Sequence, residues 1–192
     1  MPYLVASILA VSSAMIIMLT RYEADDSTIQ AELKRVESMF SLIDGFVNVY
    51  IESGESVTTA NFEALDEDDI LYDSIETNPN PSTGAGVNTT ITFQNSGVTW
   101  RIVPSSEVNN GASLTPSITF DTSSYILFMN FTSDSTLMSK NRFSESFIGR
   151  EYCENNLFGT FRNDFVSYNS TTKEIADTGN NSDGILACII YK

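Results

Sequence analysis

The chain has 192 residues, with 25 acidic and 10 basic side chains, no histidine and a net charge of −15. This acidic excess disfavours contact with nucleic acid, because there is no cationic stripe to displace counterions from phosphates. The lack of histidine removes the commonest general base and transition-metal ligand. Gly-rich phosphate loops and Ser-His-Asp sets are also missing from the sequence, so we expect neither an enzyme nor a bound cofactor.

A single long helix is predicted for residues 1–53, and its segment 1–24 is apolar. Residues 1–20 carry no charged side chain, and Arg21 is the first charge. From Ile29 onward, apolar residues recur at steps of four and three, which indicates one helix face packed against a folded head. The residues predicted to make this contact are Ile29, Leu33, Val36, Phe40, Ile43, Val47 and Tyr50.

The uncharged start of the chain has three interpretations. A cleavable secretory signal would begin with basic residues and end at a small-residue cleavage site, and neither condition is well met. A permanent membrane anchor fits a length of about 20 apolar residues. The positive-inside rule gives the anchor little support, however, because only Arg21 flanks the segment and it lies on the C-terminal side. The interpretation that we favour is a mature chain whose basic leader has been removed.

Residues 54–192 are predicted to form one β-rich head. Its first part, 54–86, reads as loop and short irregular elements, with an acidic cluster and a Pro- and Gly-rich connector at 78–86. After the connector the apolar period shifts to two, and consecutive short strands argue for an antiparallel sheet. The predicted strands are 87–93, 97–103, 117–120, 125–131, 158–168 and 184–191. The fold class is therefore α+β, with the second half of the helix on one sheet face.

The two cysteines, Cys153 and Cys188, lie in the last fifth of the chain. In a chain with an exported, membrane-embedded start, their expected state is a disulfide. Closing a loop of this size would stabilise the fold by about 3–4 kcal/mol. The alternative is a pair of reduced, buried thiols.

In this order of parts the chain resembles a mature type IV pilin or pseudopilin, and its Met start resembles the type IVb branch. The resemblance covers the whole architecture, and it also implies that the cysteine pair closes a surface loop. It implies a homo-oligomeric helical filament at the cell surface, built by a pilus assembly machinery from subunits held in the inner membrane. The residues implied to form the filament core are Met1, Leu4, Val5, Ile8, Leu9, Val11, Met15, Ile16, Ile17 and Leu19.

The chain departs from the family at its fifth position. The family usually has a Glu there, which pairs with the N-terminal amine of a neighbouring subunit, whereas this chain has Val5. A minor or tip pilin and an archaeal-type pilin with an all-β head therefore stay open. The alternative from another class is a signal-anchored extracytoplasmic domain that binds or senses a ligand.

Further candidate sites carry weaker signals. The oxygen-rich segment 177–184 supplies weak calcium candidates, Asp177, Asn180 and Asp183, because hard cations take carboxylate and carbonyl oxygens. Its spacing does not fit an EF-hand, so we interpret it first as a cluster of turn residues.

Trp100 is interpreted as a core residue rather than a sugar-stacking platform. Four Asn-X-Ser/Thr sequons are present, at Asn88, Asn130, Asn169 and Asn180.

Overall fold

The computed structural model describes residues 2–79, 86–108, 120–121, 123–139, 141–177 and 183–192, with the backbone alone for residues 2–26, 141–143, 166 and 177. The chain begins with the helix α1, Pro2–Glu52. The later elements are η1 (Val57–Thr59), α2 (Phe62–Glu67), β1 (Ile75–Asn78), β2 (Thr90–Phe93), β3 (Thr99–Pro104), η2 (Ser105–Glu107), β4 (Ser124–Asn130), α3 (Ser135–Met138), α4 (Asn141–Phe147), the π-helical η3 (Ile148–Asn156), β5 (Thr160–Arg162), β6 (Phe165–Asn169), β7 (Glu174–Asp177) and β8 (Ile185–Tyr191).

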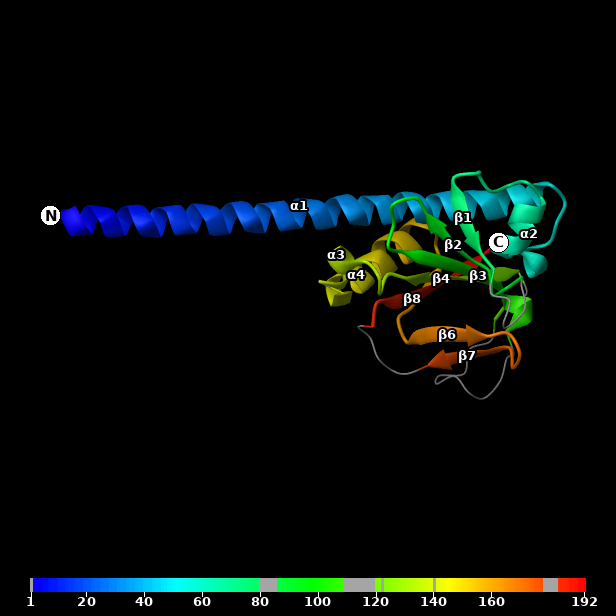
Figure 1. Ribbon diagram of the computed structural model, residues 1–192. Helices are drawn as coiled ribbons and strands as arrows, with labels where there is room; N and C mark the ends of the chain where they lie inside the picture. The colour runs from blue at the N-terminus through cyan, green and yellow to red at the C-terminus, as the bar shows by residue number, and fades with distance from the viewer. Residues whose placement is uncertain (1, 80–85, 109–119, 122, 140, 178–182) are drawn as a thin grey trace.

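Six strands form an antiparallel sheet in the order β1-β2-β3-β4-β8-β5, and β6 and β7 form a separate hairpin. The helix α1 lies on one face of the sheet and the β6–β7 hairpin on the other, so the head has three layers (Figure 1). The predicted α+β class, with a helix on an antiparallel sheet, is confirmed.

Both faces of the central strands are buried, which explains why β4 and β8 are almost continuously apolar. Along β4, Tyr125, Leu127 and Met129 join the core beneath α1, whereas Ile126 and Phe128 join the core beneath the hairpin. The side chains of β8 alternate in the same way. A strand that is covered on two sides has no polar face to present, so its sequence loses the alternation of a half-exposed strand.

The second half of α1 packs on the sheet through one stripe of side chains. All seven residues singled out by the four-and-three spacing are at most 5% exposed, and Met39 and Phe46 widen the stripe. The helix continues past the head at its N-terminal end (Figure 1). With 51 residues, α1 is about 76 Å long at 1.5 Å per residue.

Several sequence-based predictions differ from the structure. The segment 54–86 was expected to hold only loop and irregular elements, yet it contributes the edge strand β1, in which Ile75 is the only buried residue. A single strand was predicted for 158–168, but the chain bends at 163–164 into β5 and β6, which belong to different sheets. At this bend Arg162 Nε donates to Asp164 Oδ1 at 2.7 Å. Most of the predicted strand 117–120 lies outside the described residues.

Candidate assembly site: the projecting helix and its anchorage

The structure divides α1 into a projecting part and an anchored part. The first buried side chain of the anchored part is Ile29, and the N-terminal part extends away from the head (Figure 1). In the part of the chain whose side chains are described, which starts at residue 27, no helix is long and apolar enough to cross a membrane. The side chains of the filament-core residues predicted between Met1 and Leu19 lie outside the described part.

The apolar contact between α1 and the sheet centres on Phe40. Its ring meets Trp100 of β3 edge-on, with 4.9 Å between the ring centroids, and lies 6.0 Å from the ring of Tyr152 in η3. Phe40 is 1% exposed and Trp100 is fully buried. Trp100 is therefore a core residue, as interpreted from the sequence.

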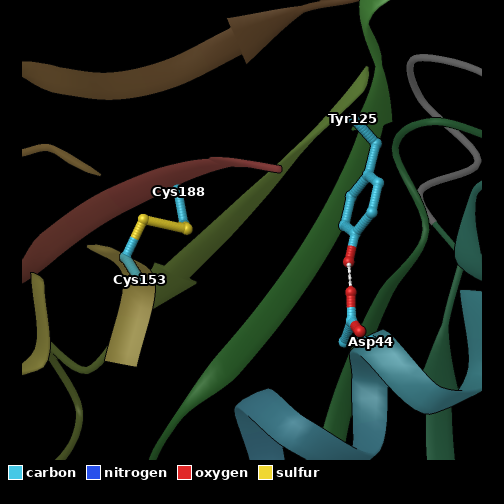
Figure 2. The surroundings of a disulfide bond; sticks show 4 residues. All are labelled: Asp44, Tyr125, Cys153 and Cys188. Atoms are coloured by element: carbon cyan, nitrogen blue, oxygen red, sulfur yellow. Dashed lines mark hydrogen bonds between the residues drawn. A yellow bond between two sulfur atoms is a disulfide. The ribbon is translucent and has the colours of Figure 1, made fainter. Parts of the chain in front are cut away.

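A polar contact lies in the same interface and fixes the helix on the sheet. Asp44 of α1 accepts a hydrogen bond of 2.7 Å from the hydroxyl of Tyr125, and Lys192 Nζ lies 2.6 Å from the same carboxylate oxygen. Asn48 donates to the other oxygen at 3.0 Å. Figure 2 shows the Tyr125 hydroxyl pointing from β4 straight at Asp44. Burial raises the pKa of Tyr125 well above its ordinary value, and the negative charge of Asp44 raises it further.

Further hydrogen bonds hold α1 along its anchored part. The hydroxyl of Tyr152 donates to the main-chain oxygen of Leu33 at 2.9 Å. Arg35 Nη1 donates to the main-chain oxygen of Asn95, in the β2–β3 turn, at 2.6 Å. The Tyr50 hydroxyl lies 3.0 Å from the hydroxyl of Thr59. Because these contacts are spread over several turns of helix, they oppose both sliding and rotation of α1 on the head.

The predicted disulfide is confirmed: Cys153 and Cys188 are bonded, which joins η3 to β8 (Figure 2). Tyr152 of η3 donates a hydrogen bond to α1, so the disulfide links the segment that holds α1 to the central strand β8. Gly159 lets the chain pass close to this bond, because a Cβ there would lie 2.6 Å from the Ile189 oxygen and 2.9 Å from Cys188 Sγ.

Of the three calcium candidates, Asn180 and the side chain of Asp177 lie outside the described residues. Asp183 Oδ1 accepts a hydrogen bond of 2.9 Å from Ile185 N. The fully buried Glu145 accepts one of 2.8 Å from Gly184 N. Burial raises the pKa of Glu145, and Asp183 adds to this shift. Among the described residues, no group of three or more His, Cys, Asp or Glu side chains could hold a metal ion.

The structure separates the sequons by accessibility. Asn88 is 4% exposed and its amide donates to Ser170 Oγ at 2.7 Å, so this amide is not accessible in the folded chain. Asn169 is exposed at the β6–β7 turn, where its oxygen accepts from the main-chain nitrogen of Thr171 at 2.9 Å. Asn180 lies outside the described residues.

Sequence reasoning missed the polar anchor. One signal was available, because Asp44 comes four residues after Phe40 and therefore falls on the predicted apolar stripe. Its partners could not be found in this way, since Tyr125 and Lys192 are far away in sequence.

Comparisons with known protein families, characterised proteins and solved structures found no match to this chain.

Proposed function

We propose that this protein is a structural subunit of a type IV pilus-like extracellular filament, which assembles through the apolar N-terminal part of α1. The observation that carries the proposal is the division of one continuous helix at about Ile29. C-terminal to this point α1 is anchored on the head, and N-terminal to it the uncharged segment 2–20 extends beyond the head (Figure 1). A helix built in this way can place its apolar part in a membrane or among copies of itself.

The apolar segment is stable only where it is shielded from water. Relative to water, burying about 1,000 Å² of apolar surface per helix gives on the order of 25 kcal/mol before ordering costs are subtracted, and both a membrane and a bundle of helices provide this burial. A contact between unlike surfaces of successive subunits produces an open helical filament when the rotation between subunits does not close a ring. Before assembly, the same segment would hold the subunit in the inner membrane, where a pilus assembly machinery would collect it.

The anchorage of α1 supports the same function. In a filament built through the helices, any load on a head must pass through the contact between that head and its helix. Asp44, Tyr125, Lys192 and the Tyr152 hydrogen bond hold this contact by polar interactions in addition to apolar burial. The disulfide adds a covalent restraint beside it.

A second candidate function is an anchored extracytoplasmic domain that binds a ligand without forming a polymer. The observation that favours it is a cavity beside Arg101 on the sheet face away from α1. A minor or tip pilin would combine the two functions, since such a subunit could carry a binding site at the end of a filament.

The test is electron microscopy of material sheared from the surface of the native cell, with mass spectrometry of the fibres. We expect thin, uniform fibres with this chain as their main component. Ile8→Asp, in the apolar segment, should abolish them because it puts a charge into the core. Thr172→Asp, exposed at the β6–β7 turn away from α1, is the control and should leave fibres intact. Trace amounts would indicate a minor subunit, and complete retention in membranes without fibres would contradict the filament.

A further inference from the structure

A cavity of about 230 Å³ lies on the sheet face that carries the β6–β7 hairpin. Side chains of the sheet form its floor, and strand β6 forms a wall. It is smaller than the roughly 300–1,000 Å³ of sites for drug-sized ligands, so it suits one small molecule or a single sugar unit. Its polar lining consists of Arg101, Thr90, Thr99, Asn130, Ser167 and Tyr168.

Arg101 is a partly buried cation without a counter-charge among the described residues. Among the described residues its guanidinium makes one hydrogen bond, from Nη1 to the main-chain oxygen of Tyr168, and this bond is long at 3.5 Å. No described carboxylate lies within 4.0 Å of its guanidinium. The other partly buried cations that the structure describes all have such a partner: Arg35 with Glu32, Arg162 with Asp164, and Lys173 with Glu107.

This arrangement is unfavourable for stability unless something else binds the guanidinium. Burial lowers the pKa of Arg101, because desolvation disfavours the charged form of the guanidinium. The group still carries its charge at neutral pH, because a guanidinium does not lose its proton there. In a chain with 25 acidic residues, a carboxylate next to Arg101 would have been the ordinary solution. Most of the guanidinium donors are instead left for a ligand in the cavity.

The neighbouring groups define the rest of the ligand. The side-chain oxygen of Asn130 is occupied, because it accepts from Thr132 N at 2.9 Å and from Thr132 Oγ1 at 2.7 Å. The Asn130 amide therefore offers donors. The hydroxyls of Thr90 and Ser167 can both donate and accept, and Phe128 supplies an apolar surface. Hydroxyls, an amide, an aromatic ring and one guanidinium are the groups that bind a ring with several hydroxyls and one carboxylate.

We propose that this cavity binds a single carboxylated sugar unit, with its carboxylate on Arg101 and its ring hydroxyls on the Thr, Ser and Asn side chains. Guanidinium and carboxylate match as a two-pronged hydrogen-bonded pair. The high net negative charge of the chain works against unspecific capture of anions, so recognition depends on contacts within the cavity. The inference goes beyond filament formation and does not depend on it.

The test is saturation-transfer NMR on the full chain, in a detergent without a sugar headgroup and in about 0.15 M salt, where long-range charge effects are screened beyond about 8 Å. D-glucuronate is the probe, and D-glucose is the matched ligand that lacks the carboxylate. We expect glucuronate to bind with a Kd on the order of 1 mM and glucose to bind at least about tenfold more weakly.

Variants connect the binding to the proposed residue. Arg101→Met should weaken glucuronate binding at least about tenfold, and Arg101→Lys should give a smaller loss, because it keeps the charge but loses the fork of donors. Arg150→Met removes an exposed arginine and is the matched control, with unchanged binding expected. Circular dichroism checks that each variant is folded.

Three outcomes would overturn the proposal. One is the absence of glucuronate binding at about 20 mM, twenty times the expected Kd. Another is equal binding by the wild-type chain and a folded Arg101→Met variant. The third is equal affinity for N-acetylglycine, which carries a carboxylate without ring hydroxyls, because the cavity would then recognise carboxylates in general rather than a sugar.

Discussion

Replacing Tyr125 by phenylalanine removes one hydroxyl from the polar contact that holds α1 on the sheet. The side chain is fully buried, and its hydroxyl donates to the Asp44 carboxylate at 2.7 Å. A hydrogen bond to a charged group contributes about 1.5–3 kcal/mol. Asp44 keeps Lys192 and Asn48 as partners, so we expect a loss in the lower half of this range, about 2 kcal/mol at pH 7.

Urea unfolding of the full chain in a nonionic detergent measures this loss. Trp100 is the single tryptophan and is buried against Phe40, so its fluorescence reports on the contact between helix and sheet. With a slope of about 2 kcal/mol per molar urea, the midpoint should fall by about 1 M. Tyr191→Phe is the control, because Tyr191 is 50% exposed, and its effect should stay within about 0.5 kcal/mol.

Alkaline pH gives an independent check on the same residue. The folded-state pKa of Tyr125 is raised well above its ordinary value, so its contribution to stability is complete below pH 10 and is lost as the pH rises further. With an unfolded pKa of about 10, this loss is about 1.4 kcal/mol at pH 11. The Phe variant lacks it, so the difference between the two chains should shrink from about 2 to about 0.6 kcal/mol. A difference below about 0.5 kcal/mol at pH 7, or one that does not change with pH, would refute the reasoning.

Three further predictions concern the disulfide and two glycines, and each is checked by urea or thermal unfolding. Replacing Cys153 and Cys188 together by alanine should cost about 4 kcal/mol, from the closure entropy of a loop with a sequence separation of 35; reducing agent should destabilise the wild type but not the variant. Gly45→Ala should stabilise the chain by about 0.5–1 kcal/mol, because Gly45 lies inside α1 with no heavy atom within 4 Å of an added Cβ. Gly159→Ala should instead destabilise it by about 1–3 kcal/mol, since its Cβ would overlap the Ile189 oxygen. Equal changes in stability for the two glycine substitutions would contradict the argument that the space around the added Cβ decides the sign of the effect.

The elements that could be predicted are those whose burial repeats regularly along the chain. The stripe from Ile29 to Tyr50 follows the helical period and is buried in the structure. The central strands β3, β4 and β8 lie close to the predicted ranges, because they are long and rich in apolar residues. The edge strand β1 gave no such signal, since only Ile75 among its residues is buried.

The candidate sites also divide into those that could be predicted from the sequence and those that could not. The disulfide was predicted from the number of cysteines and from the expectation that the chain is exported. The anchor of α1 and the cavity beside Arg101 did not, because each combines residues from segments that meet only in the folded chain. Tyr125 and Asp44 are 81 residues apart, and Arg101 and Tyr168 are 67 apart.

By itself, the sequence determined the long helix, its uncharged start, the β-rich head and the pairing of its two cysteines. Local periodicity and composition suffice for these features, because the spacing of apolar residues indicates which face of each element is buried. Only the tertiary structure decided the strand order, the split of 158–168 between two sheets and the partners of Asp44 and Arg101. These depend on which distant segments pack together, and a side chain acquires its partner, its burial and its shifted pKa only when that packing is complete.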